Sequence, residues 1–138
     1  MTGDEVRRLQ QRYVEMINDG DAAAADDLIA PDYVDPAAAP DDPPGPAGFK
    51  RLLGRVKSAF PDFHVTIDDE LLTERDGIVV RFHWEGTHRG PFLGIEPTGR
   101  RVRVAGICVD RWEAGKLVEE WELTDRAGLV EQLTGPAD

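Results

Sequence analysis

The sequence predicts one α+β domain in which N-terminal helices cover one face of an antiparallel sheet. Two observations support this fold class. Apolar residues recur at the spacing of amphipathic helices up to about residue 60, whereas beyond it they alternate with polar residues, as in strands with one buried face. Helices followed by a series of strands are typical of α+β domains. The 138 residues suffice for one hydrophobic core and show no internal repeat, so we expect a single domain spanning residues 1–138.

Three helices are expected before the first strand. The first spans residues 4–17, where apolar side chains share one helical face. The second is alanine-rich and is capped by Asp21. Residues 35–47, rich in proline, alanine and aspartate, are expected to form a loop. The third helix starts at Gly45-Pro46, because proline is tolerated at the first helical position, and it ends at about residue 60.

The strands occupy the second half of the chain. They are expected within residues 63–68, 78–85, 101–112 and 116–123. Asp76-Gly77 is a favourable hairpin turn between the first two, and a longer loop covers residues 89–100. Asp125 is expected to cap a short C-terminal helix. A curved sheet of about four long strands, wrapped around three helices, can stay partly hollow, so we expect the functional site in its interior.

The last two strands are expected to be joined by a three-residue turn, residues 113–115, with glycine at the bulge position. This turn predicts three facing pairs: Trp112 with Lys116, Cys108 with Glu120, and Gly106 with Glu122.

Two orientations of the last strand are compatible with the alternation of side chains. In the first, Glu120 and Glu122 both point into an apolar interior, where burial and mutual repulsion raise their pKa values and suit them to proton transfer. In the second, both carboxylates lie on a solvated face, and Leu117, Trp121 and Leu123 pack inward.

Composition limits the partners and the location. The net charge of −11 opposes binding to nucleic acid or to an anionic membrane. Cys108 is the only cysteine, so no internal disulfide can form. The first residues lack the features of a signal peptide, and no apolar run reaches the length of a membrane span, so a cytoplasmic protein is expected. The three histidines and the cysteine show no metal-ligand spacing, so no metal site is expected.

Four segments, taken in order, give the chain a resemblance to a known family. They are Asn18-Asp19-Gly20-Asp21 with Pro31-Asp32-Tyr33-Val34-Asp35; Gly45-Pro46 with Ala59-Phe60-Pro61-Asp62; Gly86-Thr87-His88-Arg89-Gly90 with Pro97-Thr98-Gly99-Arg100; and Gly115-Lys116-Leu117-Val118-Glu119 with Trp121 and Gly128-Leu129. The ordered set covers nearly the whole chain and resembles the SnoaL-like polyketide cyclases. The resemblance implies a cone-shaped fold like that of nuclear transport factors, a homodimer formed through the sheet, and no cofactor.

The resemblance also implies a reaction and residues for it. The best-known members of this family close the last ring of an aromatic polyketide by an intramolecular aldol step. Their general acid/base follows the tryptophan of the last strand, and that position is Glu122 here, one methylene longer than the family's aspartate. Fourteen residues upstream, Cys108 stands where a histidine is common, and Asp35-Pro36 stands where an aspartate-histidine pair is often seen.

We therefore predict a cofactor-independent enzyme of secondary metabolism that acts on an apolar, carbonyl-bearing, polyketide-like molecule. The catalytic candidates are Glu122 and Glu120. The candidates for substrate binding are His88, Cys108, Trp84, Phe82, Tyr33 and Asp35. Each also has a structural interpretation: a histidine bonded to backbone, a small buried thiol, core aromatic rings, or residues at the rim.

Other functions on the same fold stay open. They are a ketosteroid-isomerase-like enzyme, an epoxide-hydrolase-like enzyme that would need an arginine such as Arg81, Arg103 or Arg111 in its cavity, and a non-catalytic module for a small ligand or a protein partner.

Overall fold

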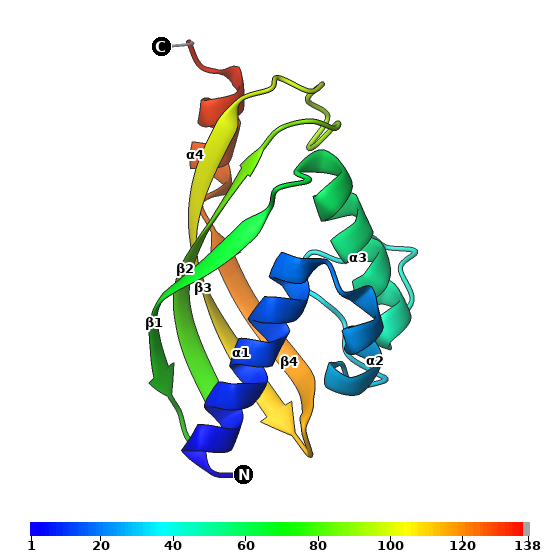
Figure 1. Cartoon of the computed structure of the whole chain (residues 1–138), viewed down its shortest axis with the longest axis vertical. Helices are drawn as coiled ribbons and strands as arrows, with labels where there is room; N and C mark the ends of the chain where they lie inside the picture. Colours follow the sequence, from blue (N-terminus) through cyan, green and yellow to red (C-terminus); the bar gives the residue numbers. More distant parts are fainter. Residues whose placement is uncertain (137–138) are drawn as a thin grey trace.

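Figure 1 shows the computed structural model of the chain, which describes residues 1–136. The helices α1 (Gly3–Asp19), α2 (Ala25–Leu28) and α3 (Gly45–Ala59) lie on one face of a single sheet. Its strands pair antiparallel in chain order and are β1 (His64–Leu72), β2 (Gly77–Thr87), β3 (Arg101–Glu113) and β4 (Lys116–Thr124). The helix α4 (Arg126–Thr134) follows at one end of the cone. The predicted α+β architecture is confirmed.

Local signals account for most helix starts. Pro46 occupies the first turn of α3, as expected. The Asp125 side chain accepts a hydrogen bond from the Gly128 backbone N–H at 2.9 Å, which confirms it as the cap of α4. The predicted cap at Asp21 is wrong, because its side chain makes no capping hydrogen bond and a short 3₁₀ turn, Ala22–Ala24, precedes α2. Within residues 1–136, no helix is long and apolar enough to cross a membrane.

Polar contacts fasten helices to both edge strands of the sheet. On β1, the Asn18 side chain donates to the Val65 carbonyl at 3.0 Å and accepts from the Val65 N–H at 2.7 Å. On β4, Lys116 Nζ donates to the backbone carbonyls of Asp26 and Asp27 at 3.3 and 3.0 Å. Because α1 and α2 hold opposite edges, the curved sheet encloses space on its inner face instead of opening flat.

The inner face of the sheet follows the predicted alternation of side chains. Buried residues of β3 on this face are Val102, Val104, Cys108, Asp110 and Trp112. On β4, Glu120 and Glu122 line the interior, whereas Trp121 and Leu123 are 56% and 59% exposed. The structure therefore has the first of the two orientations considered for the last strand, with its carboxylates pointing inward.

The turn between β3 and β4 differs from the prediction. Only Ala114 and Gly115 form it, and both have positive φ (49° and 81°), as a two-residue type I′ hairpin requires. Val118 is then the extra residue of a β-bulge. The pairs around the bulge are Glu113 with Lys116, Trp112 with Leu117, and Arg111 with Glu119.

The predicted facing pairs are therefore wrong, by one residue at Trp112 and by two residues at Cys108 and Gly106, which lie beyond the bulge. In the structure Cys108 faces Glu122, Asp110 faces Glu120, and Gly106 faces Thr124. The extra residue of the bulge has the same effect on the alternation of side chains as the third residue of the expected turn. Cys108 and Glu122 consequently share the inner face, as expected.

Candidate active site

A largely apolar cavity of about 250 Å³ lies between the helices and the sheet, near the lower end of the volumes that hold small molecules. Aliphatic and aromatic side chains form most of its wall, among them Tyr13, Phe49, Leu53, Val80, Phe82 and Trp84. Its exposed lining residues, Ala37, Leu93, Thr124 and Arg126, mark the mouth. The cone is therefore hollow, as the sequence predicted.

Four carboxyl groups gather on one side of this cavity. Asp35, Glu120 and Glu122 line it, whereas Asp110 is fully buried behind the wall, facing Glu120 across the strands. Three of the four come from β3 and β4 and the fourth from the loop after α2. Such a concentration of acidic groups in apolar surroundings requires that some of them hold protons.

The loop that carries Asp35 is fixed against β4. Ile29 forms a parallel bridge with Leu117, which aligns the start of this loop with the strand. Further along, the Tyr33 hydroxyl donates to Asp35 Oδ2 at 2.9 Å and lies 3.4 Å from Glu120 Oε2. Tyr33 does not line the cavity, so its predicted role at the rim is replaced by a buried contact that orients Asp35.

Glu122 has the properties of a base that works near neutral pH. Burial raises its pKa from the ordinary 4.5 to about 7, and the charges of Asp35 and Asp110 contribute in the same direction. No hydrogen bond from a donor in residues 1–136 opposes this rise. Thr124, the next inward position on β4, also lines the cavity and leads from Glu122 towards the mouth.

Glu120 lies deeper and holds its proton more tightly. Burial raises its pKa well above the ordinary value, and the charges of Asp110, Glu122 and Asp35 raise it further. Burial also raises the pKa values of Asp35 and Asp110. Because the pKa of Glu120 is raised further than that of Glu122, the pocket offers both a base, Glu122, and an acid, Glu120.

Cys108 lines the cavity as a buried thiol. Burial raises its pKa above the ordinary value, and the charge of Asp110 adds to the effect, so it is no thiolate nucleophile. Its Sγ and one oxygen each of Asp110 and Glu120 lie within 4.8 Å of one another. The predicted register placed Cys108 opposite Glu120 but did not include Asp110, which faces Glu120 only in the observed register.

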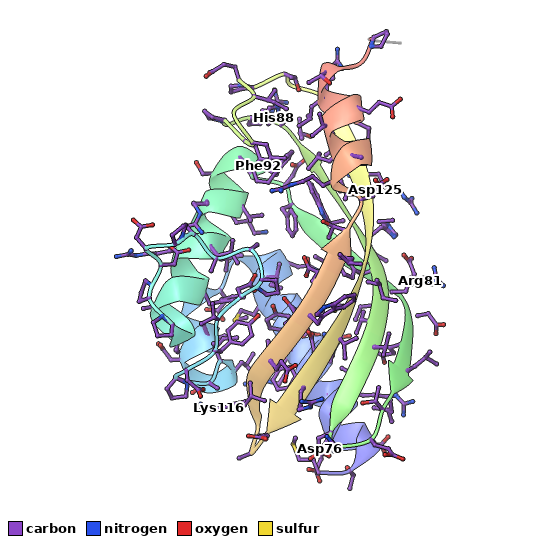
Figure 2. The ribbon with its side chains drawn as sticks, turned by 180° about the vertical axis from the view of Figure 1, so that it is seen from behind. Asp76, Arg81, His88, Phe92, Lys116 and Asp125 are labelled. Carbon is purple, nitrogen blue, oxygen red and sulfur yellow. The ribbon has the colours of Figure 1, made fainter. Side chains whose placement is uncertain are left out.

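The remaining binding candidates divide into two groups. Phe82 and Trp84 line the cavity, as predicted for a hollow cone-shaped fold. His88 does not: it is fully buried, its Nδ1 accepts from the Thr98 N–H at 3.1 Å, and its ring stacks on Phe60 at 5.5 Å between centroids. Figure 2 shows His88 near the end of the molecule where α4 lies. The histidine thus supports the Phe60 ring, which itself lines the cavity.

The arginines expected for an epoxide-hydrolase-like site lie elsewhere. Arg81, Arg103 and Arg111 alternate with inward-facing residues, and none of them lines the cavity. Figure 2 shows Arg81 on the side of the sheet that faces away from the helices. This arrangement counts against an Asp-Arg-Asp hydrolase set in the interior.

Several polar residues of the site were not predicted, and Thr124 at the mouth is one of them. Asp110 belongs to the inward set of β3, and alternation with Cys108 and Trp112 could have pointed to it. Gln10 lies on the buried face of α1 and lines the cavity. Arg126, in the first turn of α4, lines the mouth, and nothing in the local sequence indicates that it would.

Comparisons with known proteins agree with this fold. A family model described as SnoaL-like polyketide cyclase matches residues 7–133. The chain is 29% identical over 125 residues to nogalonic acid methyl ester cyclase of Streptomyces nogalater, covering 89% of this chain and 92% of the relative. It is 30% identical over 133 residues to an aklanonic acid methyl ester cyclase of Streptomyces peucetius, covering 93% and 90% of the two chains.

Solved structures show the same similarity over almost the whole chain. TsrD from Streptomyces laurentii superposes with a TM-score of 0.86 at 28% identity, covering 99% of both chains. IdmH from Streptomyces antibioticus superposes with a TM-score of 0.77 at 29% identity, covering 93% of this chain and 97% of that one. The family match and these relatives lead to one conclusion: the chain belongs to the SnoaL-like polyketide cyclases, a family of enzymes of secondary metabolism.

Proposed function

We propose that the chain catalyses an intramolecular, aldol-type ring closure on an apolar, polyketide-like substrate bound in the cavity. One observation carries the proposal: Glu122 projects into an apolar cavity, and its pKa there is about 7. Relatives that act on nogalonic and aklanonic acid methyl esters support a carbonyl-bearing, polycyclic substrate. Such a ring closure needs one base and one acid, and side chains can supply both without a cofactor.

The proposed reaction has two proton transfers. Glu122 takes a proton from the carbon next to a substrate carbonyl, and the resulting enolate carbon forms a bond to a second carbonyl carbon of the same molecule. The alkoxide formed there takes a proton from Glu120. The aromatic walls at Phe82 and Trp84 hold the two reacting ends together and exclude water. After the product leaves, the proton on Glu122 restores that of Glu120, so no net proton is consumed.

The test is the replacement of Glu122 by Gln, which keeps the shape of the side chain and removes the base. Ring closure is followed by chromatography with nogalonic or aklanonic acid methyl ester as the probe substrate. We expect kcat to fall about 100-fold or more, the usual contribution of a general base. Glu119→Gln, an exposed neighbour on the outer face of β4, is the matched control and is expected to keep wild-type turnover. Unchanged turnover in Glu122→Gln would remove the basis of the proposal.

Two alternatives are distinguished by the same substrates. A ketosteroid-isomerase-like enzyme would use Glu122 to exchange the α-proton for deuterium from solvent without forming a carbon–carbon bond. A non-catalytic binding module would bind the ester and leave it unchanged. The observation that favours an enzyme over a binding module is the cavity itself, which is open and carries ionisable groups with perturbed pKa values.

We also propose a homodimer formed through the outer face of the sheet. Ile107, Trp121 and Leu123 are 40%, 56% and 59% exposed, and Ile107 faces Leu123 across β3 and β4, so they form a continuous apolar patch. Sedimentation velocity is expected to show a dimer for the wild type and a monomer for Trp121→Lys. A monomeric wild type at micromolar concentration would contradict the dimer. The cytoplasmic location expected from the sequence likewise stays a prediction.

A further inference from the structure

A chain of hydrogen bonds with a fixed direction runs from the core to the cavity wall. Trp112 Nε1 donates to Gln10 Oε1 at 3.0 Å, and Gln10 Nε2 donates to Asp110 Oδ2 at 2.8 Å. An indole N–H can only donate, so the Gln10 atom facing it is the carbonyl oxygen and the amide NH₂ faces Asp110. All three residues are fully buried. Trp112 therefore sets the direction of the whole chain, and Oδ2 of Asp110 must act as a hydrogen-bond acceptor.

The second oxygen of Asp110 needs a donor, and the Glu120 carboxyl is placed to provide one. Asp110 Oδ1 is buried, and no amide, amine or hydroxyl group in residues 1–136 donates a hydrogen bond to it. Asp110 and Glu120 face each other across β3 and β4, and one oxygen of each belongs to a group of atoms within 4.8 Å of one another. Two ionised carboxyls at this range in apolar surroundings repel each other strongly, whereas a proton between them removes the repulsion and satisfies Oδ1.

The surroundings of the pair decide which member holds the proton. The titratable and polar groups that face Glu120 are Gln10 and Tyr13 of α1, Tyr33 and Asp35 of the loop after α2, Cys108 and Asp110 of β3, and Glu122 of β4. The Tyr33 hydroxyl has a single proton, and its contact with Asp35 Oδ2 at 2.9 Å is shorter than its contact with Glu120 Oε2 at 3.4 Å. The Gln10 amide donates to Asp110. The donor from Gln10 at 2.8 Å stabilises an ionised Asp110, whereas the donor to Glu120, the Tyr33 hydroxyl, lies at the longer distance of 3.4 Å.

We propose that Asp110 is a positioning residue: held as an acceptor by Gln10 and Trp112, it keeps the proton of the pair on Glu120. The use of that proton rests on the proposed function. When the substrate alkoxide forms, the Glu120 O–H bond breaks and an O–H bond forms on the substrate. Glu120 is then ionised beside ionised Asp110, and their repulsion favours the return of the proton that Glu122 took from carbon. The pair thus resets the acid after each turnover.

Infrared spectroscopy of the ligand-free wild type at about pH 8.5, where Glu122 with its pKa of about 7 is ionised, tests the protonation of Glu120 directly. The carbonyl stretch of a protonated carboxylic acid is separate from the bands of carboxylates. We expect such a band, shifted when glutamate carboxyls carry ¹³C, unmoved when aspartate carboxyls carry it, and lost in Glu120→Gln. A band that moves with the aspartate label would overturn the proposal, as would the absence of any protonated carboxyl. This measurement needs no variant of Asp110 to fold.

Asp110→Asn tests the positioning role. The Asn amide can donate to Glu120 and so favours its ionised form. We expect the glutamic acid band to disappear at about pH 8.5 and kcat to fall about 100-fold. On a Glu120→Gln background, whose amide cannot ionise, the same Asp110→Asn change is expected to have little further effect on kcat. An equal loss on both backgrounds would show a merely structural role. Glu119→Gln is the control and should keep both the band and the activity.

The outcomes separate this inference from the proposed function. A glutamic acid band in a wild type that closes no ring would uphold the inference and refute the cyclase proposal. Ring closure by a wild type that shows no glutamic acid band would support the cyclase proposal and refute the inference. Tight binding of Zn²⁺ that is lost in Asp110→Asn would overturn the inference, because Cys108, Asp110 and Glu120 would then share a cation in place of a proton.

Discussion

Replacing Glu122 by Gln should stabilise the protein at alkaline pH and leave its stability at acidic pH unchanged. The pKa of Glu122 rises on folding from 4.5 to about 7, so the folded state resists ionisation of this group. Stability from Glu122 is fully present below pH 4.5, declines as pH rises towards 7, and is lost above it. At 1.36 kcal/mol per pH unit, the loss amounts to roughly 3 kcal/mol.

Urea denaturation followed by circular dichroism measures this effect between about pH 4 and pH 8.5. We expect Glu122→Gln and wild type to unfold with similar free energies at the acidic end. At the alkaline end the variant should be more stable than wild type, and the pKa change sets an upper limit of about 3 kcal/mol. The measured difference should be smaller than this limit, because the Glu122 side chain keeps partial contact with solvent. Glu119→Gln, whose ion pair with Arg111 is exposed, should change stability by less than about 1 kcal/mol at either pH. A stability difference for Glu122→Gln that does not vary with pH would refute the reasoning.

Three further substitutions test other parts of the site. Cys108→Ala should keep kcat within a few fold, because the buried thiol is not ionised; a loss comparable to that of a catalytic base would show that the thiol takes part. Arg126→Ala should raise KM with little change in kcat, because the guanidinium is exposed at the mouth, away from the carboxyl cluster; a fall in kcat at constant KM would contradict that placement. In Gly106→Ala, the added Cβ would lie 2.6 Å from Cζ of Phe82, so we expect a loss of about 1–3 kcal/mol in unfolding free energy and weaker substrate binding; wild-type values of both would show that the cavity wall adapts freely.

The sequence predicted the side of the sheet on which the carboxylates lie, but not their depth. Alternation along β4 puts Glu120 and Glu122 on the same face of the sheet for any length of the preceding turn. The family resemblance indicated that this face is the inner one. The register between β3 and β4 depends on a bulge at Val118. One extra residue in a bulge and one extra residue in the turn have the same effect on which side chains share a face. Sequence patterns cannot tell these apart, because both put Cys108 on the inner face.

Asp110 was missed for a different reason. Its position is visible in the alternation of β3, but its importance comes from two partners far away in the chain. Gln10 is 100 residues from Asp110, and Glu120 approaches it only in the observed register. His88 shows the reverse case: it stands in a motif that resembles the family, yet its contacts with Thr98 and Phe60 are structural. Burial and partners, which decide the role of a polar residue, come from the tertiary fold.

The central claim is that the Glu122 carboxyl lies in a largely apolar cavity and changes its charge near neutral pH. A ¹³C NMR titration of that carboxyl in the ligand-free protein, assigned by the resonance missing in Glu122→Gln, tests it most directly. We expect a midpoint near pH 7. A midpoint near 4.5, the ordinary value for a glutamate in water, would contradict the account.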